Sequence, residues 1–110
     1  MSMVALEADF DTATQLHRAY MPFIRHGGLF FVTSREYQMG DVIRARYRLS
    51  SSNEWFTFDG LVVWCNPLGS QGGRPPGVGL AFQLENNPHK ERIEKELVGV
   101  ASQDHFTSTM

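Results

Sequence analysis

The clearest pattern in the chain is a strict alternation of apolar and polar residues between positions 42 and 49. The apolar positions are Ile43, Ala45, Tyr47 and Leu49, and three arginines, Arg44, Arg46 and Arg48, stand between them. A period of two is typical of a half-buried antiparallel strand. Residues 50–53 have turn chemistry, so we expect a hairpin with the long apolar run Trp55–Asn66. Gly60 inside that run predicts a bulge or bend.

Three further segments have strand character. Residues 4–8 alternate weakly, and residues 29–33 are rich in β-forming side chains. In residues 77–84 a large residue follows each small one, and the small ones are Gly77, Gly79 and Ala81. A face made of small residues lets another backbone, a helix or a ligand approach closely. Residues 67–76, rich in glycine and proline, predict a loop.

Two helices are expected at opposite ends of the chain. Asp11 or Thr12 can cap a short helical turn that Pro22 must end. Asn87 and Pro88 suit the cap and first position of a second helix. Its apolar face would consist of Ile93, Leu97, Val100 and Ala101. The resulting fold class is mainly β: a small antiparallel β-barrel, closed or flanked by a C-terminal α-helix. We expect the domain to span residues 1–101 and a flexible tail to span residues 102–110.

Composition narrows the classes of function. A chain of 110 residues forms one small domain, and a net charge of -2 gives no electrostatic reason to expect a nucleic-acid ligand. The single cysteine, Cys65, suits a reducing compartment, and no apolar run approaches the ~20 residues that span a bilayer. We therefore expect a cytoplasmic protein that does not insert directly into a membrane.

Candidate chemical groups are scarce. The four histidines, His17, His26, His89 and His105, lack the spacing of a metal site, and no serine stands in a nucleophile motif. We expect Trp64 and Phe82 to be core aromatic residues and Cys65 to be a small buried hydrophobic residue. The arginine stripe predicts a solvated strand face. An enzyme is the least supported class.

Several sequence blocks, in this order and spacing, resemble a PilZ domain. They are Gly27-Gly28-Leu29-Phe30, Tyr37-x-x-Gly40-Asp41, Gly60-x-Val62-x-Trp64 and Pro76-Gly77-Val78-Gly79-x-x-Phe82. The resemblance covers residues 4–98. With Tyr20-Met21-Pro22-Phe23-Ile24 ahead of the blocks and residues 105–110 after them, the chain is similar to the single-domain subfamily of type IV pilus assembly.

Members of the family that bind cyclic di-GMP have two motifs that this chain lacks. An Arg-x-x-x-Arg motif is absent before the barrel, because Pro22 stands four residues after Arg18. In the Asp/Asn-x-Ser-x-x-Gly motif, aligned on Gly28, Phe23 replaces the polar residue and Arg25 replaces the serine. The resemblance therefore implies a fold without the family's nucleotide and without any other cofactor.

The resemblance also implies partners. The segment made of Tyr20, Met21, Pro22, Phe23 and Ile24 resembles the surface that binds the pilus extension ATPase, and a second surface would bind a degenerate EAL-domain regulator. Of these residues we expect Tyr20 and Met21 to be exposed, whereas Phe23 and Ile24 could equally plug the barrel. Two alternatives remain: a cyclic di-GMP receptor that uses Arg18 and Arg25, and a small barrel that binds single-stranded nucleic acid.

Overall fold

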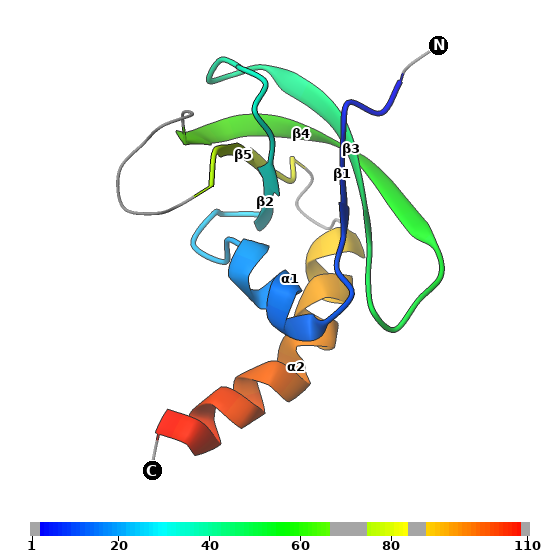
Figure 1. The fold of residues 1–110 in the computed structure, drawn as a ribbon, viewed down its shortest axis with the longest axis vertical. Helices are drawn as coiled ribbons and strands as arrows, with labels where there is room; N and C mark the ends of the chain where they lie inside the picture. Colours follow the sequence, from blue (N-terminus) through cyan, green and yellow to red (C-terminus); the bar gives the residue numbers. More distant parts are fainter. Residues whose placement is uncertain (1–2, 67–74, 84–87, 109–110) are drawn as a thin grey trace.

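A computed structural model describes residues 3–66, 75–83 and 88–108, and for residues 99–108 it describes only the backbone. Five strands form one curled sheet, which two helices flank on one side (Figure 1). In chain order the elements are β1 (Leu6–Asp9), α1 (Ala13–Ala19), β2 (Gly28–Val32), β3 (Val42–Arg48), β4 (Trp55–Asn66), β5 (Gly77–Ala81) and α2 (Pro88–Ser108).

The strand order across the sheet is β1-β3-β4-β5-β2. The predicted hairpin is confirmed: β3 and β4 pair antiparallel from Val42 opposite Leu61 to Arg48 opposite Trp55. β5 pairs antiparallel with both β4 and β2. β1 is the exception to the expected antiparallel barrel, because it pairs parallel with β3. The sheet is a half-barrel whose two edge strands are β1 and β2.

Helix boundaries follow local chemistry. The Thr12 hydroxyl accepts a hydrogen bond from the Gln15 amide at 3.2 Å, so Thr12 is the N-cap of α1. Leu16 is the fully buried residue of this short helix. α2 begins at Pro88, as predicted; the expected cap, Asn87, lies outside the described residues. The backbone of α2 continues to Ser108, through most of the segment for which we predicted a flexible tail.

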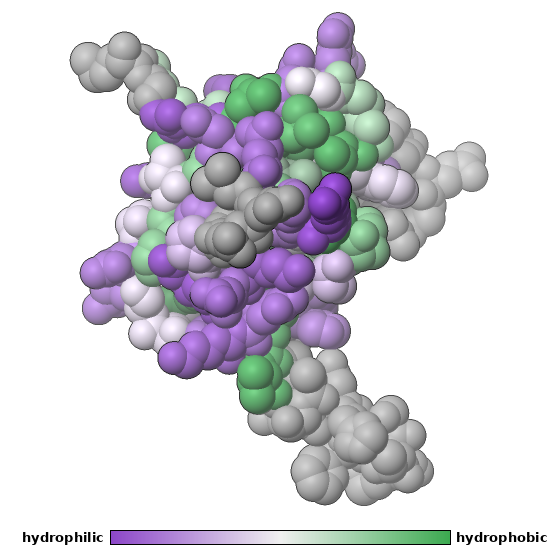
Figure 2. All heavy atoms as spheres, turned by 180° about the vertical axis from the view of Figure 1, so that it is seen from behind, coloured by the Kyte–Doolittle hydropathy of each residue, from purple (hydrophilic) through white to green (hydrophobic). Residues whose placement is uncertain are grey.

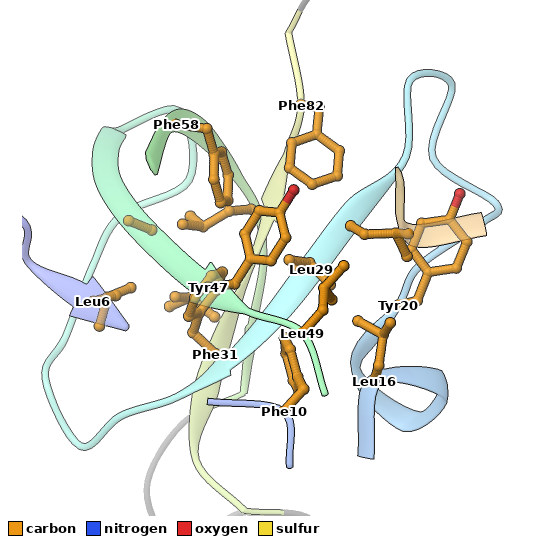
Figure 3. Packing of buried hydrophobic residues seen from close by; sticks show 14 of the residues in the cluster. Leu6, Phe10, Leu16, Tyr20, Leu29, Phe31, Tyr47, Leu49, Phe58 and Phe82 are labelled. Carbon is orange, nitrogen blue, oxygen red and sulfur yellow. The ribbon is translucent and has the colours of Figure 1, made fainter. Parts of the chain in front are cut away.

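The core fills the concave side of the sheet and the space between the helices. The inward residues of β3, Ala45 and Tyr47, have no exposed surface, and Leu49 just after the strand is also buried. Phe31 and Phe58 lie with their ring centroids 6.1 Å apart, and Phe58 and Phe82 lie 4.7 Å apart (Figure 3). Ile93 and Leu97, on the predicted apolar face of α2, complete the core. Val100 and Ala101 of that face lie outside the described side chains.

Candidate functional site

The described surface contains an apolar groove of about 740 Å³. Its walls come from the two edge strands, β1 and β2, from α1, and from the end of β4. Residues 20–24, which follow α1, supply Tyr20, Met21 and Phe23 to the same lining. The groove therefore includes part of the segment for which the sequence predicts partner binding.

The floor of the groove depends on two glycines of β5. A Cβ atom on Gly79 would lie 2.8 Å from the Met21 sulfur and 3.0 Å from Cβ of Trp64. A Cβ atom on Gly77 would lie 2.5 Å from the Phe30 ring and 2.3 Å from a backbone oxygen. The sequence predicted that another backbone, a helix or a ligand approaches the small residues of β5 closely. In the structure, side chains and backbone of the same chain occupy that space. Met21 fills the slot over Gly79, where the register places Trp64 and Phe30 on either side.

The expectation that Tyr20 and Met21 are exposed is wrong. They retain 9% and 8% of their accessible surface. Tyr20 forms an isolated antiparallel bridge with Leu29, and the Met21 amide donates to the Gly28 carbonyl at 2.9 Å. This short extended backbone sends successive side chains to opposite faces, so Tyr20 enters the core and Met21 covers the outer face of β5.

Phe23, in contrast, is exposed, with 78% of its surface accessible. It does not plug the barrel. Pro22 is also exposed, whereas Ile24 is half-buried and its side chain lies against Gly28, where an added Cβ atom would approach it at 2.9 Å. The reason is the turn that follows Met21, in which the Gly27 amide bonds to the Ile24 carbonyl at 2.8 Å. This turn leaves Phe23 on the rim of the groove.

Trp64, which we expected in the core, is 45% exposed and lines the groove. The sequence predicted a bulge or bend at Gly60; the register of β4 against β5 shifts further along, between Val62 and Trp64. The extra residue reverses the alternation, so Val62 points inward while Trp64 points outward. Phe82, by contrast, is buried as expected. Cys65 is exposed rather than buried, and its thiol lies 3.9 Å from the Met39 sulfur.

Val32 was not predicted as a site residue, yet it is 66% exposed on the groove wall. It is the last residue of edge strand β2 and lies opposite Gly77. The sequence contained one usable signal for this surface, the run of small residues in β5, because large side chains from neighbouring strands must cover such a run or remain exposed beside it. Phe23, Val32 and Trp64 together form an exposed apolar rim.

The predicted arginine stripe lies on the outer face of β3, but it is paired rather than only solvated. Arg44 binds Asp59 at 2.8 Å and Arg46 binds Glu7 at 2.6 Å, while Arg48 pairs with Asp9. The Arg44 guanidinium holds the pKa of the Asp59 carboxyl below its usual value. Trp55 lies beneath two of these guanidinium groups, with its ring centroid 4.4 Å from Arg46 and 5.2 Å from Arg48.

Helix α2 contacts residues 20–24, the segment that lines the groove, through Tyr20. The Tyr20 hydroxyl donates to Oε2 of Glu94 at 2.7 Å, and burial followed by this carboxylate raises the pKa of the phenol. Tyr20 also packs near Leu16 of α1 in the core (Figure 3). The position of the groove floor is therefore linked through Tyr20 to the packing of both helices.

A second contact of α2 lies at the mouth of the half-barrel. Arg92 donates to the Tyr47 hydroxyl at 3.0 Å, and this hydroxyl lies 2.7 Å from Nδ1 of His89. Burial and then the Arg92 charge lower the pKa of His89 to about 4, so the imidazole is neutral and its Nδ1 accepts a hydrogen bond from the Tyr47 hydroxyl. The imidazole stacks on Phe82 with centroids 5.3 Å apart. This arrangement explains His89 as a structural residue.

A third contact joins α2 to the hairpin. Glu96 accepts hydrogen bonds from the Ser50 and Ser51 hydroxyls at 2.8 and 2.6 Å. Burial would raise the pKa of Glu96, but the hydrogen bonds from the serine turn outweigh it and lower the pKa. These polar contacts position α2 across the sheet; they do not bring a nucleophile and a base together.

The two arginines of the alternative nucleotide site, Arg18 and Arg25, do not both line the groove. Arg18 is exposed in the last turn of α1 and lines the groove, whereas Arg25 is exposed but does not line it. Within the described ranges, no group of three or more histidine, cysteine or acidic residues could hold a metal ion. Over the same ranges, no helix is long and apolar enough to cross a membrane.

Comparison with known families gives one match: residues 4–99 match the PilZ domain. This span includes every element from β1 to β5 and the first half of α2. A comparison with curated proteins found no significant match.

Proposed function

The chain belongs to the PilZ domain family, and on that premise we propose that it is a non-enzymatic adaptor of type IV pilus biogenesis and twitching motility. PilZ domains are generally binding or adaptor domains associated with cyclic di-GMP signalling, not enzymes. In this proposal the chain bridges the pilus extension ATPase and a degenerate EAL-domain regulator. It is a cytoplasmic monomer when isolated, and its partners recruit it to the inner membrane or the cell pole.

The observation that supports this proposal is the apolar rim of the groove. Phe23, Val32 and Trp64 retain 78%, 66% and 45% of their accessible surface. Clusters of exposed aromatic and aliphatic side chains around a concavity are typical of protein interfaces, where a few such residues supply most of the binding energy. We assign the extension ATPase to this surface. The EAL-domain regulator would then bind elsewhere, with the exposed side of α2 as our candidate.

The same residues disfavour a nucleotide ligand. Where relatives that bind cyclic di-GMP have a polar residue to hold the guanine edge, this chain exposes Phe23. Arg18 lines the groove and Arg25 does not, so the groove does not bring the two guanidinium groups together around a phosphate. The nucleic-acid alternative loses its main support as well, because carboxylates pair with all three arginines of the β3 stripe.

Binding of the purified extension ATPase to a Phe23→Asp variant tests the proposal. We expect an affinity loss of at least tenfold, which is about 1.4 kcal/mol or more, measured by biolayer interferometry. Met39→Asp is the matched control, because Met39 is a 64% exposed apolar residue that does not line the groove. Circular dichroism would establish that both variants are folded. Equal affinities of the two variants for the ATPase would contradict the assignment.

Calorimetry with cyclic di-GMP tests the other half of the proposal. We expect no heat of binding at micromolar concentrations of the chain. Micromolar or tighter binding that Arg18→Gln abolishes would instead establish the receptor alternative.

A further inference from the structure

Several polar side chains of the apolar groove have a partner within the chain, and of its two charged residues, Glu7 and Arg18, only Glu7 is paired within the described part of the chain. The Glu7 carboxylate is paired with Arg46 at 2.6 Å. Gln15 accepts the Asp11 amide through its side-chain oxygen at 2.9 Å, and the Asn66 amide donates to the Pro75 carbonyl at 2.6 Å. These contacts leave those side chains with little capacity to select a ligand.

Arg18 is the exception. It lines the groove in the last turn of α1, and it is exposed. Among the residues that the structure describes, its guanidinium has no carboxylate and no hydrogen-bond partner. Since Glu7 is paired with Arg46, which lies outside the lining, the unpaired charge of the described lining is the positive charge of Arg18.

The rest of the lining is apolar. Phe23, Val32 and Trp64 present their side chains to solvent around the slot that Met21 fills. A ligand that covers them must supply apolar surface, since a polar group placed there would lose its water without gaining a hydrogen bond. A guanidinium at the edge of such a surface favours a carboxylate, with which it can form two parallel hydrogen bonds.

We propose that the groove binds a peptide segment in which aromatic or aliphatic side chains stand next to an aspartate or glutamate, with the carboxylate paired to Arg18. This inference rests on the proposed function only in taking the ligand to be a protein. The apolar side chains cover the rim of Phe23, Val32 and Trp64, and the acidic residue sets the orientation of the segment along the groove. Arg18 is thus a specificity-determining residue for the groove.

Selection from a random peptide display library on the intact chain tests this. We expect the enriched peptides to combine apolar residues with at least one acidic residue and to lose binding to the Phe23→Asp variant. Arg18→Gln should weaken the best acidic peptide about tenfold, which corresponds to one charge-assisted hydrogen bond, and should remove most of the salt dependence of its affinity. Arg35→Gln is the matched control, an exposed arginine outside the groove that should leave the affinity unchanged.

A charge reversal sharpens the test. Selection on Arg18→Glu should enrich lysine or arginine in place of the acidic residue. Enriched peptides without acidic residues, an affinity indifferent to Arg18→Gln, or no enrichment at all would overturn the inference. So would binding of the chain to phosphatidylglycerol vesicles that requires Phe23, because the groove would then bind a lipid surface.

The outcome is separable from that of the proposed function. Acidic groove peptides together with an extension ATPase that does not bind would retain this inference and reject the assigned partner. ATPase binding that requires Phe23 but is unaffected by Arg18→Gln would retain the assigned partner and reject the role of Arg18.

Discussion

The two halves of the outer face of the sheet are covered by different kinds of side chain. Over β1, β3 and the start of β4, charged side chains pair with one another across neighbouring strands, as Arg46 does with Glu7. Over β5, β2 and the end of β4, large apolar side chains lie across a strand of small residues, and several remain exposed. Figure 2 shows the molecule from behind: hydrophilic residues cover much of the middle of this face, and hydrophobic residues gather mainly in its upper part. We call the two regions the ionic half and the apolar half.

The difference between the halves indicates which one is available to a partner. In the ionic half each arginine of the stripe already has its opposite charge, and exposed ion pairs contribute little to stability or binding. In the apolar half Phe23, Val32 and Trp64 are exposed to solvent. Side chains close to them nevertheless pack tightly against the glycines of β5. A sheet able to cover one half with ion pairs has no evident structural need to leave the other half exposed.

The largest effect should come from Gly77→Ala in the apolar half. The new methyl group would lie 2.3 Å from the Phe31 carbonyl oxygen, a backbone atom that cannot move unless β2 shifts. We expect the free energy of unfolding to fall by about 3 kcal/mol, measured by urea denaturation. Thr57→Ala, at an exposed position of β4 in the ionic half, should change it by less than about 0.5 kcal/mol. Similar losses for both would refute the asymmetry in packing.

Acid should weaken the interior before it weakens the ionic half. The pKa of His89 is about 4 in the folded chain and 6.5 ordinarily. Stability from the neutral imidazole is therefore complete above pH 6.5 and is lost as the pH falls towards 4. We expect a loss of about 2 kcal/mol over this range, less than the full pKa shift implies because the ring is only partly buried.

Thermal unfolding at a series of pH values measures this effect. His89→Gln should flatten the dependence between pH 6.5 and 4. The Asp59 carboxyl, whose pKa Arg44 lowers, contributes stability above its ordinary pKa of 3.8 and loses it only below that value. An unchanged slope in His89→Gln would exclude the imidazole as the cause.

Gly79→Ala should alter the groove at a smaller cost in stability. The methyl group would meet the flexible end of Met21, at 2.8 Å from its sulfur, so the side chain can leave the slot. We expect a loss of about 1 kcal/mol and a changed affinity for any groove ligand. Met21→Ala in the same chain should recover part of the stability lost, because the two substitutions share the slot. Purely additive losses in this double-mutant cycle would show that Met21 does not occupy it.

The smallest effect should be Arg46→Ala in the ionic half. Its ion pair with Glu7 is exposed, so we expect a change in the free energy of unfolding of at most about 1 kcal/mol, and less at high salt. Part of any loss would come from Trp55, which the guanidinium covers. A loss that salt leaves unchanged would assign the effect to that packing instead of to the charge.

The sequence was sufficient where local pattern decides the structure. The alternation in β3, the cap at Thr12 and the start of α2 at Pro88 each depend on residues near in the chain. The same reasoning failed for Trp64, because the position of the bulge depends on how β4 pairs with β5. A slip of one residue then reverses which side chains face the core.

Tyr20 illustrates the second limit. Its ring packs in the core and its hydroxyl bonds to Glu94, a residue far along the chain that only the packing of α2 brings near. The sequence did single out the segment that contains Phe23. It could not show that the exposed aromatic of that segment is Phe23 while Tyr20 and Met21 are internal supports.

The order of strands also has a consequence for biosynthesis. The two edge strands that line the groove both come early in the chain, but β1 has β3 as its strand neighbour and β2 has β5. As the chain leaves the ribosome, β2 emerges early and must wait for Gly77–Ala81 before it has a strand to pair with. A nascent chain halted before Gly77 would thus expose Leu29 and Phe31, which makes the early part of this protein a natural client for a ribosome-associated chaperone.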